Sequence, residues 1–257
     1  MNRNSNNAHT FKEVVILLTA TVDVRDVSFM DRQDADVRLN DYKQALRLWL
    51  KTPDSFSLVF CENSGYDLSE IVQIVEECNP YNKQVELLSF DDNNYSRELG
   101  KGYGEIRTIA YAINHSKILK LDALIVKVTG RYYIQNIGSI ITGLSQMSES
   151  DSYCDLSRNL SWADTRIFCS TIPFLTKFMI PMQEVCNDTE GVTVENILAR
   201  AVHKCLAQGK SWSMLPCYPD IRGVSGTNGL AYPCSFWFRI KHSLFHCLKA
   251  ILLAFSC

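Results

Sequence analysis

Short apolar runs alternate with segments of helical period along the first half of the chain. The runs are expected to be buried strands, and the segments between them carry apolar residues on one side of a helix. Strands are predicted at 13–20, 57–61, 84–90 and 121–128, and helices at 36–50, at 67–77 and directly after Gly104. Strands and helices in this order predict an α/β fold with a mainly parallel sheet flanked by helices.

The pattern is less regular after residue 132. Short strands are predicted at 154–156 and 166–171, helices at 137–144, 173–185 and 194–207, and a glycine-rich loop at 219–232 that is long enough to cover a site. We expect a disordered tail at 1–11, a single domain at 12–233 and a C-terminal amphipathic helix at 234–257.

The C-terminal segment combines apolar and basic residues. Trp237, Leu244 and Leu248 share one helical face, while Arg239 and Lys241 interrupt the apolar run. A membrane-spanning helix needs about 20 mostly apolar residues, so this segment is a poor candidate. Two interpretations stay open: a basic amphipathic helix on an anionic membrane, and a helix docked on the domain.

Composition narrows the possible functions. The net charge of −2 gives no basic field for nucleic acid. The ten cysteines form no C-x-x-C pair and no Cys/His group with zinc spacing, so we expect free thiols and a reducing compartment. The N-terminus has no signal-peptide core, and the expected location is the cytoplasm.

The strand predicted at 121–128 carries the most informative charges. Lys127 lies inside its apolar pattern, where a cation needs an anionic partner, and Arg131 follows just past its end. Ligands of open α/β sheets bind at this edge, and two cations there suit a diphosphate. The alternative is a structural ion pair with Glu62 or Glu105. The loop expected to meet the ligand comprises Thr129, Gly130 and Arg131.

Alternating glycines precede the third predicted helix. Gly100, Gly102 and Gly104 are separated by Lys101 and Tyr103, and Glu105 follows. Glycines allow close approach of the backbone to a ligand, and a helix N-terminus attracts anions. We therefore predict a phosphate contact, with a plain glycine-rich turn as the alternative.

The first two predicted strands end in small polar residues. These groups suit a base or ribose, although strand ends and turns also favour them. The candidates are Thr19, Ala20 and Thr21 after the first strand, and Glu62, Asn63 and Ser64 after the second.

Over residues 14–232 the chain resembles the glycosyltransferases of bacterial O-antigen and capsule biosynthesis. The resemblance rests on the order of the motifs described above, followed by a last one at Gly223–Thr227. The resemblance implies a GT-A-like fold, a nucleotide-sugar donor, for which we expect a UDP-sugar, and a lipid-linked or growing glycan acceptor. It also implies a role in lipopolysaccharide or capsule synthesis at the cytoplasmic face of the inner membrane.

The chain departs from that family where a metal would bind. GT-A enzymes usually carry D-x-D after the glycine-helix unit, and this chain has Lys127-Val128-Thr129 there. The resemblance with this departure predicts transfer without a cofactor, with Lys127, Arg131 and Lys101 stabilising the departing nucleotide. A divalent metal is the alternative.

An inverting transfer also needs a base on the acceptor side, for which Asp164 and Glu195 are equal candidates. Two other classes stay open: a nucleotidyl- or phosphotransferase on a similar fold, and a non-catalytic nucleotide- or glycan-binding partner.

Overall fold

The computed structural model describes residues 13–25, 33–92, 94–225, 229–232 and 236–254. Its centre is a seven-stranded sheet in the order β10-β6-β9-β4-β1-β2-β3. The sheet strands are β1 (Glu13–Ala20), β2 (Ser57–Glu62), β3 (Val85–Ser89), β4 (Ala123–Thr129), β6 (Ser152–Tyr153), β9 (Ile167–Thr171) and β10 (Trp212–Ser213). Two small ribbons pair β5 (Tyr133–Ile134) with β11 (Ile221–Arg222), and β7 (Leu156–Ser157) with β8 (Trp162–Ala163).

Strand direction confirms the predicted class. β1 pairs in parallel with β2 and with β4, and β2 pairs in parallel with β3. β9 runs antiparallel to β4 and β6. The fold is therefore α/β with a mainly parallel sheet, and the parallel strands bring their carboxyl ends to one edge.

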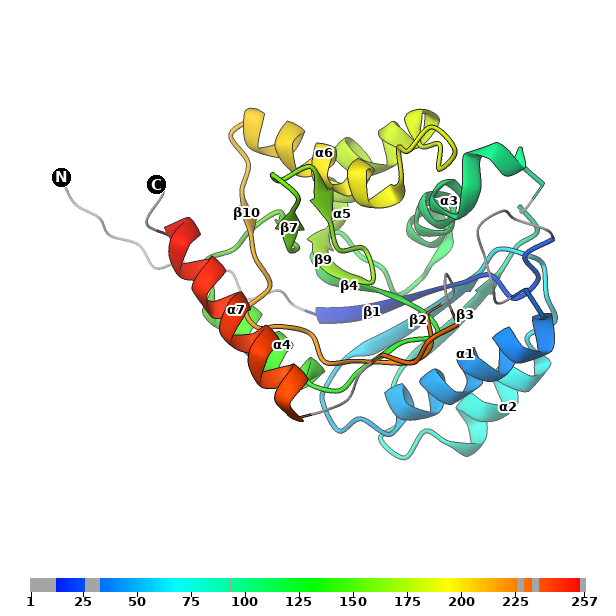
Figure 1. The fold of residues 1–257 in the computed structure, drawn as a ribbon. Coiled ribbons are helices and arrows are strands. Elements are labelled where there is room, and N and C mark those ends of the chain that lie inside the picture. The colour runs from blue at the N-terminus through cyan, green and yellow to red at the C-terminus, as the bar shows by residue number, and fades with distance from the viewer. Residues whose placement is uncertain (1–12, 26–32, 93, 226–228, 233–235, 255–257) are drawn as a thin grey trace.

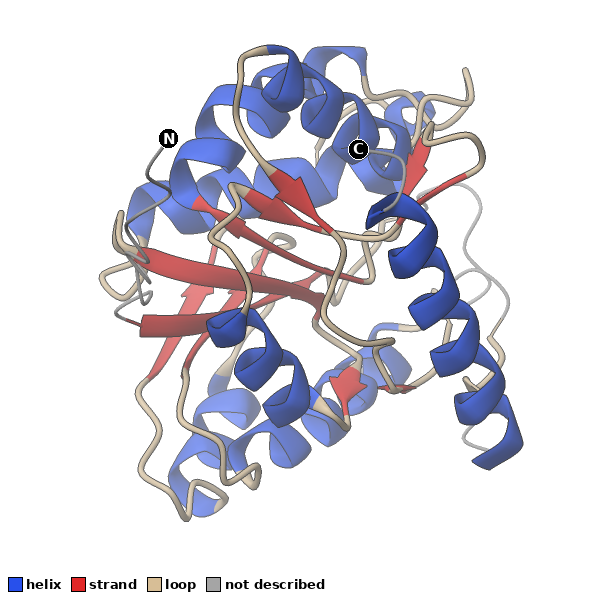
Figure 2. Ribbon diagram, turned by 90° about the vertical axis from the view of Figure 1, so that its left-hand side faces the viewer, coloured by secondary structure: helices blue, strands red, loops and turns tan. Residues whose placement is uncertain are grey.

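Helices cover both faces of the sheet (Figures 1 and 2). Val15 and Leu17 of β1 point into the core beneath α3 and α6, and Ile16 and Leu18 point into the core beneath α1, α2 and α4. This alternation is the period of a strand buried on both faces. The helices are α1 (Ala35–Leu50), α2 (Ser69–Glu77), α3 (Gly100–His115), α4 (Ile137–Gln146), α6 (Val194–Ala207) and α7 (Phe236–Ala254), with a short 3-10 turn (Arg97–Leu99) before α3.

Two predictions for local structure need correction. The helix predicted at 173–185 is three short pieces: α5 (Ile172–Phe174), a π-helical turn (Leu175–Met179) and a 3-10 helix (Ile180–Val185). Pro181 near the start of the last piece cannot donate an α-helical hydrogen bond, which accounts for the break. The strand predicted at 154–156 is largely wrong: only Leu156 belongs to a strand, β7, and residues 154–155 connect β7 to β6. The disordered tail predicted at 1–11 lies outside the described residues.

The C-terminal helix α7 docks on the domain through polar contacts. His246 is buried, its Nε2 lies 2.8 Å from the Leu215 carbonyl oxygen, and its Nδ1 lies 3.3 Å from Asp155 Oδ2. Lys249 Nζ donates to the Leu156 carbonyl. Because both imidazole nitrogens face acceptors, the doubly protonated cation satisfies this site best. Within the described residues, no helix combines the length and the hydropathy needed to cross a membrane.

The His246 contact predicts a pH-dependent stability. Burial and Lys249 lower the pKa of His246, but the hydrogen bond and charge of Asp155 and the Leu215 carbonyl leave it raised. The stabilisation is therefore fully present below about pH 6.5 and lost as the pH rises through the raised pKa. Urea unfolding at pH 6 should show His246→Gln to be less stable than wild type by about 1.5–3 kcal/mol, and the gap should narrow at pH 8.5.

The matched control for that experiment is His115→Gln. His115 is exposed at the end of α3, where its ring stacks on Tyr111 and its Nδ1 lies 2.9 Å from the Tyr111 carbonyl oxygen, both within its own helix. A gap between wild type and His246→Gln that stays constant from pH 6 to 8.5 would contradict a charged His246.

Candidate functional site

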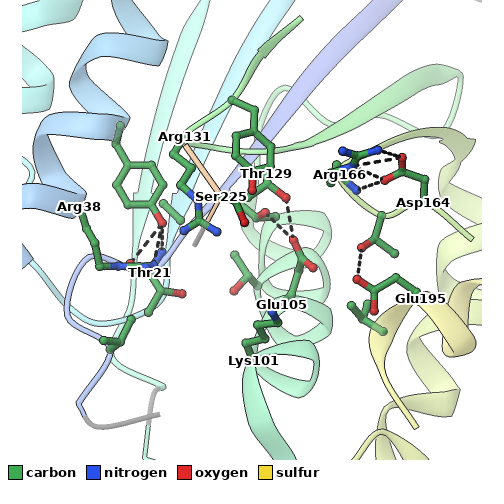
Figure 3. A pocket seen from close by; sticks show the side chains of 18 of the residues that line it. Thr21, Arg38, Lys101, Glu105, Thr129, Arg131, Asp164, Arg166, Glu195 and Ser225 are labelled. Carbon is green, nitrogen blue, oxygen red and sulfur yellow. Dashed lines mark hydrogen bonds and ion pairs between the residues drawn. The ribbon is translucent and has the colours of Figure 1, made fainter. Parts of the chain in front are cut away.

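A pocket of about 450 Å³ opens at the carboxyl edge of the sheet, where β1 and β4 end (Figure 3). Its size is within the range of small-molecule sites. It is lined by Thr19, Ala20, Thr21, Val24, Arg38, Tyr42, Tyr95, Lys101, Glu105, Thr108, Thr129, Arg131, Tyr132, Trp162, Asp164, Thr165, Arg166, Val194, Glu195, Ser225 and Tyr232. The structure thus gathers Thr19, Thr129, Arg131, Asp164 and Glu195, all named from sequence, around one cavity.

Arg38 of α1 forms one wall of the pocket. Its guanidinium is almost fully buried, and its Nε donates to the Thr21 carbonyl at 2.8 Å. Nη2 lies 3.2 Å from the Tyr42 hydroxyl, which also accepts from the Thr21 amide at 3.0 Å. Burial lowers the pKa of Arg38, and the nearby charge of Arg131 adds to this effect. A second cation therefore supports the β1 end, and the prediction from sequence missed it.

The sequence of α1 does indicate that Arg38 is buried. It shares the inner face of α1 with Tyr42, Leu46 and Trp49 at helical spacing, although it is charged. An arginine in that position is costly unless it is hydrogen-bonded. Asp34, part of a D-x-D sequence, instead caps the same helix by accepting from the Val37 amide at 2.9 Å.

Arg131 follows β4 and lines the pocket between Arg38 and Glu105 (Figure 3). Its Nε is buried and has no hydrogen-bond partner. Gly130 allows this position, since its amide donates to the Thr19 carbonyl at 2.8 Å and an added Cβ would lie only 2.8 Å from that oxygen. An unpaired guanidinium nitrogen in a buried place is a ready donor for an anionic ligand.

Lys127 is placed differently from the predicted phosphate contact. It is fully buried in β4, forms an ion pair with Glu105, and donates to the Thr165 carbonyl at 2.7 Å. Glu105, which does line the pocket, also accepts from the Thr19 hydroxyl at 3.2 Å. The structure therefore has the alternative arrangement, an ion pair with Glu105, and Lys127 is not among the residues that line the pocket.

The polar residues at the end of β2 and just after it do not line the pocket. Glu62 is buried and accepts from the amides of Val22 and Ser64, both at 2.9 Å. Asn63 donates to the Gly104 carbonyl at 3.4 Å, and the Ser64 hydroxyl accepts from the Asp23 amide at 3.0 Å. Glu62 and Ser64 hold the backbone that follows Thr21, Asn63 contacts α3, and none of the three lines the pocket.

The glycines of α3 serve packing. The helix begins at Gly100 itself, so the glycines are its first turns and not a loop before it. An added Cβ would lie 2.3 Å from Asp188 at Gly100 and 2.1 Å from the Tyr95 hydroxyl at Gly104. Lys101 and Glu105, between and after them, do line the pocket.

The N-terminus of α3 already binds a carboxylate of the protein itself, that of Asp188. Asp188 accepts from the Gly102 amide at 3.4 Å, and burial raises the pKa of this carboxyl. A helix N-terminus favours a negative charge, and here Asp188 supplies one. We therefore do not assign a phosphate to Gly100, Gly102 or Tyr103.

The two candidate bases differ in their partners. Asp164 holds Arg166 in a bidentate pair, with distances of 2.9 Å from Nε to Oδ1 and 2.6 Å from Nη2 to Oδ2. Although burial lowers the pKa of Arg166, the hydrogen bonds and charge of Asp164 leave it raised. Glu195, in the first turn of α6, accepts a hydrogen bond from the Thr165 hydroxyl at 3.3 Å, and within the described residues its carboxylate has no ion-pair partner. A carboxylate without a bonded cation is the better proton acceptor.

The glycine-rich segment 219–232 covers part of the pocket. β11 attaches it to β5, and Ser225 and Tyr232 line the cavity. The Tyr232 hydroxyl lies 3.3 Å from that of Tyr132, and their rings meet edge to face. This agrees with the prediction of a covering loop, although residues 226–228 lie outside the described part of the chain.

Two of the three acidic side chains that line the pocket fit a divalent metal poorly. Glu105 is bonded to the Lys127 ammonium and Asp164 to the Arg166 guanidinium. A metal ion would compete with these cations for the same oxygens. In the described part of the chain, no three His, Cys, Asp or Glu side chains are grouped so that they could hold an ion.

No family model matches the sequence, and no curated protein matches it. Among solved structures, the chain overlaps the mannosyltransferase PcManGT from Pyrobaculum calidifontis, in complex with GDP-Man and Mn²⁺, with a TM-score of 0.47 and 9% identity. The overlap covers 79% of this chain and 55% of that chain. The glycosyltransferase GlyE of Streptococcus pneumoniae TIGR4 gives a TM-score of 0.46 and 6% identity, over 79% of this chain and 45% of that chain.

A third overlap is with the nucleoside-diphosphate-sugar pyrophosphorylase of Vibrio cholerae RC9, with a TM-score of 0.43 and 10% identity, over 79% of this chain and 92% of that chain. The chain spans about half the length of the two glycosyltransferase structures. Because the TM-scores are below 0.5, we base the proposals below on the residues of this chain.

Proposed function

We propose that the protein is a glycosyltransferase that moves a hexose from a nucleotide-sugar donor to a glycan or lipid-linked acceptor. The observation that carries this proposal is the pocket at the sheet edge, with the unpaired Nε of Arg131 on one side and Glu195 on the other. Cations and a carboxylate around one cavity suit an inverting displacement of a diphosphate by a hydroxyl.

The donor half of the pocket is the part lined by the β1 and β4 ends. Arg131 would bind the diphosphate, since its buried Nε needs an acceptor and a guanidinium binds phosphate oxygens bidentately. Lys101 also lines this part and would add positive charge. Thr19, Ala20 and Thr21 line the same part and would contact the nucleoside. We expect a UDP-sugar, on the resemblance described above.

Transfer would proceed without a divalent metal. The cations of Arg131, Lys101 and Arg166 line the pocket and can neutralise the leaving diphosphate, as a metal would. Lys127 would contribute indirectly, by holding Glu105 in place. Loss of transfer on adding EDTA, with recovery on adding Mn²⁺ or Mg²⁺, would refute this part of the proposal.

On the acceptor side, Glu195 would take the proton of the attacking hydroxyl. Asp164 would position Arg166, its bidentate partner. On the resemblance, the acceptor belongs to a surface polysaccharide such as O-antigen, capsule or lipopolysaccharide, built at the cytoplasmic face of the inner membrane.

The test is a panel of nucleotide sugars with the purified protein, measured first by thermal shift. A donor at 100 times its dissociation constant should stabilise wild type by about 2.7 kcal/mol. Arg131→Ala should lose that stabilisation. The control Arg200→Ala removes an exposed arginine from α6 and should keep it. A donor that stabilises Arg131→Ala as much as wild type would refute the assignment of the diphosphate.

Product analysis then separates the remaining classes. Release of the nucleoside diphosphate with glycosylation of an acceptor supports the transferase. Release of pyrophosphate from a nucleoside triphosphate and a sugar phosphate would instead identify a nucleotidyltransferase. Binding without turnover of any donor would favour a non-catalytic partner.

A further inference from the structure

Among the described side chains of α7, four large apolar residues face solvent, while His246 is buried against the domain. The buried contacts are made by His246 and Lys249, as described above. His242 is half-buried and stacks on Tyr218 with ring centroids 5.0 Å apart. The outward side carries large apolar residues with high exposed fractions: Trp237 78%, Leu244 61%, Phe245 70% and Leu248 59%. This is the reverse of a helix that docks through an apolar stripe.

These apolar residues form one continuous surface. Residues 237, 241, 244, 245 and 248 follow the spacing of a single helical face. We call the surface made by Trp237, Lys241, Leu244, Phe245 and Leu248 the outer face of α7. Single exposed apolar residues are ordinary, but a contiguous group on one helix marks an interaction site.

Charge indicates what this face contacts. From residue 221 to residue 257 the sequence contains no Asp or Glu, and its charged residues are Arg222, Arg239, Lys241 and Lys249. A segment that combines cations with Trp, Phe and Leu and has no acidic residue complements an anionic lipid surface. Tryptophan is also typical of the boundary between headgroups and acyl chains.

Lys241 favours a lipid surface over a protein partner. It is exposed and lies within the outer face, between Trp237 and Phe245. At the centre of an apolar protein interface its ammonium would be buried, which is costly unless an acidic partner meets it. On a bilayer the long side chain can extend its ammonium to the lipid phosphates while its methylene groups stay among apolar neighbours.

We propose that the outer face of α7 binds an anionic phospholipid bilayer. The helix lies in the plane of the headgroups, with its apolar side chains inserted and Lys241 at the phosphates. The polar side stays attached to the domain through His246 and Asp155. Binding does not depend on the proposed transferase activity and is measured without any nucleotide.

The experiment is vesicle flotation with the full chain, using phosphatidylcholine vesicles with and without phosphatidylglycerol. Wild type should float with the anionic vesicles, and added salt should reduce binding. Leu244→Gln combined with Leu248→Gln should lower the partition coefficient at least about tenfold, because two apolar anchors are lost. Lys241→Glu should lower it too. The control is Leu121→Gln, a leucine that is 76% exposed just before β4.

Three outcomes would overturn the proposal: equal flotation of wild type and the double variant, equal binding to neutral and anionic vesicles, or no flotation. Light scattering adds a fourth test. If wild type dimerises and the double variant does not, the outer face is an interface between copies of the chain. Both leucines are more than half exposed, so the substitutions should leave the unfolding midpoint unchanged, and this is checked first.

Discussion

Glu195→Gln should lower the transfer rate by about 10²–10⁴-fold while donor binding stays as in wild type. Glutamine has the same shape and can still accept the hydrogen bond from the Thr165 hydroxyl, so the pocket should keep its form. What is lost is the carboxylate that takes the acceptor proton. The measurement is the initial rate of transfer at saturating donor, together with the donor dissociation constant from thermal shift.

Two further variants make this result interpretable. Glu190→Gln alters an exposed glutamate outside the pocket and should behave as wild type. Asp164→Asn should differ from Glu195→Gln, since it deprives the half-buried Arg166 of its bidentate partner and should lower stability as well as activity. Retention of the anomeric configuration in the product, or unchanged activity of Glu195→Gln, would contradict the role of Glu195 as base.

Lys127→Met should lower the free energy of unfolding by about 3 kcal/mol, measured by urea denaturation. The substitution leaves Glu105 without its cation next to a strand that is buried on both faces. Lys120→Met, at an exposed position before β4, should have little effect.

The double variant Lys127→Met with Glu105→Gln separates an ion pair from a phosphate contact. If the two side chains stabilise each other, removing both should cost less than the sum of the single losses. A Lys127→Met protein that is as stable as wild type but fails to bind any nucleotide would show the opposite, that Lys127 serves the ligand.

Some elements of the fold were predictable because their sequence pattern is local. The strand at 13–20 and the helix at 194–207 occur with the predicted bounds. A continuous apolar run predicts the strand and apolar residues at helical spacing predict the helix, and both patterns can be seen within a short stretch of sequence. The pocket location followed from the strand order, because parallel strands end at one edge. The broken helix at 172–185 was missed because the apolar period there resembles that of a continuous helix.

The residues that line the pocket also fall into two groups: those that the sequence indicated and those that only the fold revealed. Arg131 was identified because it lies just after a strand end, which is visible in sequence. Arg38 was missed because nothing local connects α1 with the end of β1; only the packing of that helix brings its guanidinium to the Thr21 carbonyl. Arg166 was missed although it is only two residues from Asp164, because only the folded structure shows that the two side chains pair at the pocket.

By itself the sequence determined that the chain forms an α/β sheet, that its strand ends carry polar groups, and that Lys127 needs an anion. Burial and secondary structure follow from neighbouring residues, so they can be inferred from the sequence alone. Only the tertiary structure decided which anion Lys127 meets and which face of α7 points outward. The partner of Lys127 and the orientation of α7 depend on how α3 and α7 pack against the rest of the domain. That packing is set by contacts between residues far apart in the chain.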